Sequence, residues 1–167
     1  MTPLPNGDMT VDDVYAALMT VKDPEIPTIS IVDMGIVTDV AVSDEGDVHV
    51  VMTPTFVGCP AIDVMRRDAQ SAVEHAGART VTVDVTFDTP WNTNRLTEAG
   101  RAALLKHGLA PPVQYDTVLD LTVLNNAACP YCNSHNTTLK SIFGPTLCRS
   151  LHYCNNCLQA FESFKPV

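Results

Sequence analysis

The stretch Thr53-Pro54-Thr55-Phe56-Val57-Gly58-Cys59-Pro60 joins a run of strand character to a run of helix character. Before it, residues 48–52 are β-branched and apolar, and Pro54 ends that run because proline has no N–H to donate to a β-ladder. After it, apolar residues recur at three- and four-residue spacing over residues 61–76, which is the period of an amphipathic helix. The stretch therefore predicts a strand–loop–helix unit.

Cys59 is expected at or beside the N-cap of this helix. Pro60 then lies near the first helical position, where its fixed φ and missing N–H cost nothing. The unpaired N–H groups and the positive dipole end of a helix favour a thiolate over a thiol. Cys59 is therefore a candidate reactive thiol or metal ligand. The alternative interpretation is a small buried hydrophobe that precedes a helix.

The apolar periodicity around this unit predicts a small α+β domain. A helix capped by Thr10 carries one apolar stripe and ends at Asp23, because a residue before proline is pushed out of the α region. Residues 36–42 alternate and pair with residues 48–53 as a hairpin, and residues 81–87 alternate as a third strand. The order α-β-β-α-β predicts one layer of sheet with its helices on one side.

A further helix is predicted after the third strand. Thr93 or Asn94 can cap it, and it runs to about Lys106. Trp91, the only tryptophan, is expected to fill the core. The stretch Leu109-Ala110-Pro111-Pro112 then marks a linker, because consecutive prolines favour an extended conformation. We therefore expect two domains, which span residues 9–108 and residues 113–167.

Two Cys-x-x-Cys pairs, Cys129-Pro130-Tyr131-Cys132 and Cys154-Asn155-Asn156-Cys157, lie in the second domain with 21 residues between them. This is the arrangement of a zinc ribbon, in which two knuckles supply four thiolates to one tetrahedral ion. Four cysteine ligands leave no position for a substrate water, so the zinc is predicted to be structural. Iron in the same thiolate cage is the alternative. A thioredoxin-like redox pair is disfavoured, because such a pair opens a helix in a βαβ context.

Three other residues near these ligands are expected to have structural roles. Cys148 is interpreted as a buried inert thiol. His135 and His152 are interpreted as structural or surface histidines, because four cysteines already complete a tetrahedral site.

Composition limits the kinds of partner and compartment. The 167 residues carry a net charge of −9, which opposes nucleic-acid binding; only residues 129–167 are not acidic, with three Lys or Arg and one Asp or Glu. No apolar run approaches the roughly 18 residues of a membrane span, and the N-terminus does not resemble a signal peptide. We therefore expect a cytoplasmic protein without a membrane or nucleic-acid partner. Cysteines stay reduced there, so six of them indicate metal or thiol chemistry.

Three stretches resemble the metal–sulfur cluster assembly family that includes SufT and the cytosolic iron–sulfur targeting proteins. They are Asp23-Pro24-Glu25-Ile26-Pro27, Ser30-Ile31-Val32-Asp33-Met34-Gly35-Ile36-Val37 and the stretch from Thr53 to Pro60. The resemblance covers about residues 9–90. It implies that Cys59, Asp23 and Glu25 hold or pass iron or an iron–sulfur cluster transiently. One cysteine cannot hold a cluster alone, so the site is either shared across a homodimer or only passes the cluster along.

The tail adds a resemblance that spans nearly the whole chain. A Cys-Pro-Tyr-Cys knuckle, Phe143-Gly144-Pro145-Thr146-Leu147-Cys148-Arg149 and the stretch from Cys154 to Pro166 resemble the PaaD family. Members of that family are accessory proteins of the phenylacetyl-CoA epoxidase complex in aerobic phenylacetate breakdown. The resemblance implies two partners, the di-iron oxygenase and its reductase, which carries flavin and a [2Fe–2S] cluster. It implies maturation or repair of their metal centres, with catalysis in other subunits.

Other function classes stay open beside this one. The protein could be a zinc-ribbon scaffold module of the same complex, or a thiol enzyme in which Cys59 is the nucleophile and His49 or His75 the base. A nucleic-acid-binding zinc ribbon is disfavoured by the acidic charge. No Glu-x-x-His pair for a carboxylate-bundle di-iron site occurs, and no Gly-x-Gly-x-x-Gly. The sequence therefore favours an accessory protein over an enzyme.

Overall fold

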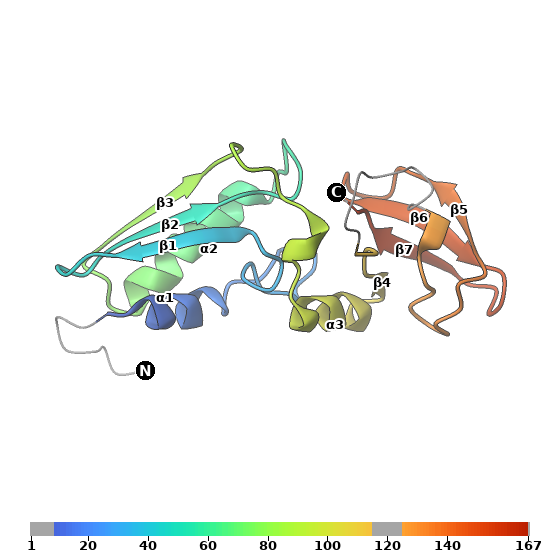
Figure 1. The fold of residues 1–167 in the computed structure, drawn as a ribbon, viewed down its shortest axis with the longest axis horizontal. Helices are drawn as coiled ribbons and strands as arrows, with labels where there is room; N and C mark the ends of the chain where they lie inside the picture. The colour runs from blue at the N-terminus through green and yellow to red at the C-terminus, as the bar shows by residue number, and fades with distance from the viewer. Residues whose placement is uncertain (1–8, 115–124, 167) are drawn as a thin grey trace. The chain divides into compact units, whose positions relative to one another are not determined.

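A computed structural model describes residues 9–114 and 125–166. The chain divides into two compact units, Met1–Trp91 and Asn92–Val167. Figure 1 shows the helices and strands of each unit. Among the described residues, no helix has the length and apolar character needed to cross a membrane.

The first unit has the predicted order α-β-β-α-β (Figure 1). Strands β1 and β2 form an antiparallel hairpin, while β2 and β3 run parallel, with Val50 opposite Val83. Parallel neighbours need a crossover, and α2 supplies it. The elements are α1 (Val11–Leu18), β1 (Val37–Val42), β2 (Asp47–Met52), α2 (Ile62–His75) and β3 (Thr80–Val85).

Both helices of this unit pack on one face of the sheet, as predicted (Figure 1). Helix α2 buries Met65, Ala69 and Val73, which recur at the spacing of one helical face. Strand β2 buries every second residue, including Val48 and Val50, so one face of the sheet meets the helices. The α+β fold class is confirmed.

Helix α1 begins as predicted but ends early. Thr10 and Asp13 form a capping box, in which each side chain accepts from the backbone N–H of the other. The helix ends at Leu18, and the prediction that it reaches Asp23 is wrong. The Thr20 hydroxyl donates to the Ala17 carbonyl at 2.6 Å, and such local bonds compete with the helical ladder.

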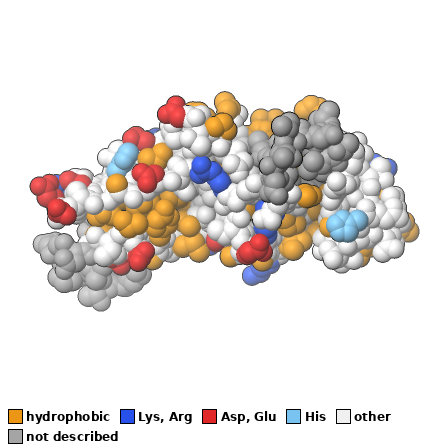
Figure 2. Space-filling model, viewed as in Figure 1, with side chains coloured by type: hydrophobic (Ala, Val, Ile, Leu, Met, Phe, Trp, Pro, Cys, Tyr) orange, Lys and Arg blue, Asp and Glu red, His pale blue; other side chains and the backbone are white. Residues whose placement is uncertain are grey.

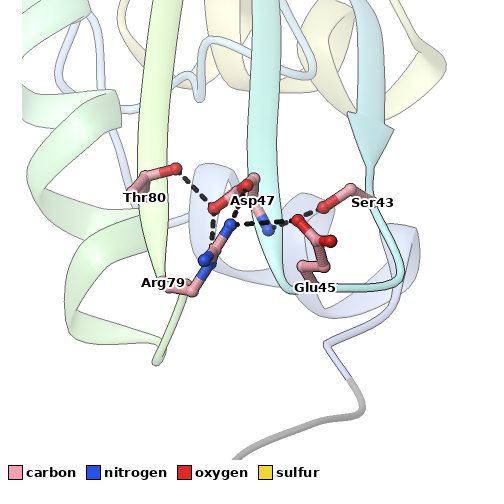
Figure 3. A network of polar contacts seen from close by, with 5 residues as sticks. All are labelled: Ser43, Glu45, Asp47, Arg79 and Thr80. Atoms are coloured by element: carbon pink, nitrogen blue, oxygen red, sulfur yellow. Dashed lines mark hydrogen bonds and ion pairs between the residues drawn. The ribbon is translucent and has the colours of Figure 1, made fainter.

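A polar network at the β1–β2 turn ties this hairpin to the start of β3 (Figure 3). Arg79 donates from Nε to Asp47 at 2.8 Å and from Nη2 to both Asp47 and Glu45, and the Thr80 hydroxyl donates to Asp47 at 2.6 Å. The bonds from Arg79 and Thr80 lower the pKa of the Asp47 carboxyl. Figure 2 shows acidic side chains gathered at this end of the sheet. Arg79 thus offsets part of the negative charge of the turn.

Trp91 closes the first unit and fills its core, as predicted. The side chain is buried, and its Nε1–H donates to the Met34 carbonyl at 3.0 Å. This bond satisfies the polar end of the indole ring inside the core.

The second unit contains a four-stranded sheet in the order β4-β7-β6-β5. Strands β5, β6 and β7 form an antiparallel meander, and β4 adds to β7 in parallel. The elements are η1 (Thr93–Arg95), α3 (Glu98–Lys106), β4 (Leu109–Ala110), β5 (Thr137–Ser141), β6 (Arg149–Cys154) and β7 (Ala160–Phe164).

Two details of this unit differ from the sequence prediction. Leu109 was expected in the linker, but it is buried in β4 opposite Glu162, so the chain joins the sheet just before the two prolines. The cap of α3 is Thr97, whose hydroxyl accepts from the Gly100 N–H at 2.9 Å, and not Thr93 or Asn94. The Asn92 side chain caps a short 3-10 turn instead, and Leu96 is extended between that turn and the helix.

Candidate metal centre and the Cys59 loop

Each Cys-x-x-Cys pair forms a tight turn at one end of the ribbon. The Asn133 N–H donates to the Cys129 carbonyl at 2.8 Å, and the Leu158 N–H donates to the Cys154 carbonyl at 3.0 Å. Asn133 and Leu158 directly follow the second cysteine of their pairs and have φ values of 57° and 60°. A left-handed backbone conformation is unfavourable for leucine. The hydrogen bond from the Leu158 N–H to the Cys154 carbonyl therefore helps to hold a backbone conformation that leucine by itself disfavours.

The two turns bring four sulfur atoms together. Sγ of Cys129 lies 3.6 Å from Sγ of Cys157, and Sγ of Cys132 lies 3.6 Å from Sγ of Cys154. All four sulfurs lie within 4.8 Å of one another. Zinc bound tetrahedrally with Zn–S bonds of about 2.3 Å spaces its sulfurs by about 3.8 Å. The donor set and its spacing therefore fit one tetrahedral metal ion.

Two of the four cysteines lie against apolar side chains, and the other two are partly or fully exposed to solvent. Cys129 and Cys154 are buried against Ala110, Ala127 and Phe161, whereas Cys132 is exposed and Cys157 is half-buried. The apolar side restricts water around two of the ligands. This arrangement suits a structural ion more than one that must reach a substrate.

A backbone hydrogen bond and burial shift the pKa values of Cys154 and Cys157 in opposite directions. The N–H of Cys157 points at Sγ of Cys154 at 3.5 Å and lowers the pKa of Cys154 to about 6. Burial raises the pKa of the Cys157 thiol to about 12. Without a cation the Cys157 thiol therefore keeps its proton at neutral pH, and a metal that binds four thiolates must release it.

Cys148 and His152 lie outside this cluster. Cys148 is half-buried, with its Sγ 3.1 Å from the Thr146 hydroxyl. His152 is buried and stacked on Phe161, its Nε2 lies 2.9 Å from the Ser150 hydroxyl, and burial lowers its pKa. These contacts give His152 a packing role in the ribbon. His135 is exposed in the turn before β5.

Cys59 lies two residues before the N-cap of α2, which is Ala61. Cys59 was predicted at or beside the N-cap and Pro60 near the first helical position; α2 begins later, so Pro60 directly precedes the N-cap and Cys59 lies one residue further from the helix. Two turns precede the helix: the Cys59 N–H donates to the Phe56 carbonyl at 3.2 Å, and the Ile62 N–H donates to the Cys59 carbonyl at 3.3 Å. Gly58, with a φ of +82°, permits the first turn. Cys59 is half-buried in this loop.

Asp23 and Glu25 lie in a turn that the Asp23 carboxylate itself organises. Its Oδ1 accepts from the N–H of Glu25 at 2.7 Å and of Ile26 at 3.0 Å. Asp23 is nearly buried and Glu25 is exposed. Over residues 9–114 and 125–166, only the four ribbon cysteines form a group of three or more ligand atoms that could share a metal. The structure thus does not gather Cys59, Asp23 and Glu25 into such a group.

Two family models match the two parts of the chain. Residues 11–87 match the model described as iron–sulfur cluster assembly protein, and residues 116–165 match the PaaD zinc beta ribbon domain. An Escherichia coli K12 protein assigned as a component of 1,2-phenylacetyl-CoA epoxidase is 36% identical over 157 residues, which cover 94% of this chain and 93% of that protein. The chain belongs to the PaaD family. Both resemblances inferred from the sequence motifs are confirmed.

The first part of this PaaD-family chain also has relatives without the ribbon. An Fe–S protein maturation auxiliary factor of Porphyromonas gingivalis is 39% identical over 90 residues, covering 53% of this chain and 85% of that factor. The solved structure of a conserved hypothetical protein of Thermotoga maritima is 34% identical, with a TM-score of 0.51, over 57% of this chain and 94% of that one. In the PaaD family the ribbon is therefore an addition to a domain that also exists alone.

Proposed function

We propose that this protein is a non-catalytic accessory factor that matures or delivers iron or iron–sulfur centres to a multicomponent phenylacetyl-CoA epoxidase. The observation that carries the proposal is the relative assigned as a component of that epoxidase, which matches both parts of the chain. The maturation factor similar to the first part supports the iron–sulfur role. The partners in this proposal are the oxygenase and reductase subunits.

Cys59 is the residue that contacts the cargo in this proposal. Its loop is only half-buried, so an iron centre of another protein can approach the sulfur. A cluster needs four ligands, so Cys59 alone cannot store one; the donor or the recipient protein, or a second copy of this chain, supplies the others. The Cys59 loop therefore suits the transfer of iron or a cluster between proteins more than its storage.

Asp23 and Glu25 have different parts in the same proposal. The Asp23 carboxylate holds the turn through two backbone N–H groups, so it positions Glu25. Glu25 is exposed and offers a hard oxygen ligand to iron.

Zinc in the four-cysteine cluster keeps the ribbon folded in this proposal. The fit of the four sulfurs to a tetrahedral ion supports this structural role of zinc.

A scaffold role in the same complex is the second candidate. The carboxylate of Asp23 is occupied by its own turn, and Cys59 shares no three-ligand group with acids in the part of the chain that is described. Both observations fit a protein that only holds other subunits together.

Growth on phenylacetate separates the two roles. In cells that depend on this protein, Cys59→Ser should abolish growth on phenylacetate while the oxygenase and reductase subunits accumulate with reduced iron. Cys148→Ser is the matched control, because Cys148 is also half-buried and lies outside the four-sulfur cluster. A Cys59→Ser strain that grows like the parent would leave the scaffold role as the better account.

A further inference from the structure

A cavity of about 470 Å³ lies on the sheet of the second unit. Leu151 and Tyr153 of β6 and Ala160 of β7 contribute to its floor, and Leu109 and Tyr131 bound it. Leu151 and Tyr131 are exposed there. Its lining combines apolar and aromatic side chains with two histidines and three charged residues, and none of its lining residues is one of the four cysteines.

The charges of the ribbon gather at this cavity. Residues 129–167 contain four Lys, Arg, Asp or Glu residues, and three of them, Lys140, Arg149 and Glu162, line it. Arg149 donates from Nη1 to Glu162 at 2.9 Å, and this pair is largely shielded from solvent. Lys140 Nζ lies 5.4 Å from the centre of the Tyr153 ring, and in the described residues it forms no ion pair. Of the two Lys or Arg side chains that line the cavity, Lys140 is therefore the one without an ion pair to a carboxylate.

The charged residues of the cavity restrict which kinds of ligand can bind there. Arg149 is already paired with Glu162, whose carboxylate would repel a ligand with several negative charges, such as a nucleic acid or a nucleotide. A single carboxylate beside Lys140 gains an ion pair next to an aromatic face. The apolar floor favours aliphatic or aromatic groups on either side of that carboxylate.

We propose that this cavity binds an extended peptide segment of a partner protein, in which an acidic residue alternates with apolar residues. In an extended segment every second side chain faces the same way, so apolar residues lie on Leu151 and Tyr153 while an acidic neighbour reaches Lys140 at the rim. The site does not depend on the maturation role, because Cys59 and the metal cluster take no part in it.

The test measures binding of a fluorescein-labelled peptide, in which a single glutamate is flanked by leucines and the remaining positions are serine, to the full zinc-loaded chain by fluorescence anisotropy. We expect binding at a Kd of about 100 μM or tighter, weakened at least about tenfold in Lys140→Glu. Lys165→Glu is the matched control, since it makes the same charge change in the same unit but lies over Phe143, away from the cavity. That variant should bind within about twofold of the parent.

Peptide chemistry and a second variant complete the test. The same peptide with glutamine or lysine in place of glutamate should bind at least about tenfold more weakly. Leu151→Ser, a change at an exposed residue, should weaken binding without altering the folded state seen by circular dichroism. Equal losses in Lys140→Glu and Lys165→Glu would overturn the proposal in favour of general electrostatic attraction. Absence of binding would also overturn it. Displacement of the peptide by benzoate at an equal molar concentration would overturn it as well, because the cavity would then bind a small aromatic carboxylate and not a peptide.

Discussion

Gly144 is a residue whose identity the packing of the ribbon dictates. A Cβ built on Gly144 would lie 2.9 Å from the backbone carbon, the carbonyl oxygen and the Cβ of Arg149. The Gly144 N–H donates to that same carbonyl at 2.9 Å, so the loop cannot move away without losing the bond. The glycine in the stretch from Phe143 to Arg149 is therefore needed for close approach of two backbones.

We predict that Gly144→Ala destabilises the second unit by about 1–3 kcal/mol, because the neighbouring atoms are backbone and cannot rotate away. Thermal unfolding of the zinc-loaded protein measures this, followed by circular dichroism. Unfolding at the temperature of the parent would mean that the loop relaxes freely. The unfolding of the first unit, followed by Trp91 fluorescence, serves as the internal control.

At the scale of elements, the hairpin of β1 and β2 is held to β3 by Arg79 and Asp47 as well as by the ladder. The pKa of Asp47 is lowered in the folded state by the bonds from Arg79 and Thr80. A group with a lowered pKa stabilises the fold above its unfolded pKa, and that contribution is lost as the pH falls through its folded pKa.

We therefore predict that Asp47→Asn lowers the urea midpoint of the first unit at pH 7, and that the difference from the parent shrinks as the pH falls below about 4. Trp91 fluorescence reports the transition, since the only tryptophan is buried in this unit. Asp44→Asn is the control, because it removes one charge from the same turn without a bond to Arg79. Equal shifts in both variants would assign the effect to net charge alone.

The elements that the sequence predicted are those with a repeated pattern. Alternation located the β1–β2 hairpin and β3, and the three- and four-residue spacing located α2. Local contacts decided the features that were missed: the Thr20 hydroxyl ends α1 early, and two turns around Gly58 separate Cys59 from α2. Strand β4 has two residues, too few for any period, and only its pairing with β7 defines it.

Among the site residues too, those with a repeated spacing could be predicted from the sequence, and those brought together only by the fold could not. The spacing of Cys129, Cys132, Cys154 and Cys157 indicated one cluster, and the structure brings the four sulfurs together. The cavity on the ribbon sheet was missed, because it joins residues from separate strands to Tyr131 and Leu109. The sequence did hold one sign of it, since three of the four charged residues of the tail line that cavity.

At the scale of the whole molecule, the two units have different sources of stability. The first buries an apolar core between α1, α2 and the sheet, whereas the second surrounds a four-cysteine cluster with few large apolar side chains. Metal binding to such a cluster contributes folding free energy directly, on the order of 10 kcal/mol for small zinc sites. Separate folding of the two parts stays a prediction, and the division into units places the boundary after Trp91.

We predict two unfolding transitions, of which a chelator abolishes only one. Removal of zinc, or Cys154→Ala, should eliminate the transition of the second unit and leave the Trp91 fluorescence transition within a few degrees of its position. Metal content by atomic absorption provides the control for zinc loss. A Trp91 transition that disappears with the metal would mean that the ribbon is required for the fold of the first unit.

Cys59 is proposed to pass iron or a cluster to the epoxidase subunits, and cluster transfer in vitro tests this role most directly. Parent protein and Cys59→Ser are each incubated without oxygen with ferric iron, sulfide and the reductase stripped of its cluster, and the iron and labile sulfide of the re-isolated reductase are measured. We expect the parent to raise the cluster content of the reductase well above that of a reaction without it, whereas Cys59→Ser, with zinc still bound, should not. Equal cluster content with parent and Cys59→Ser would contradict it.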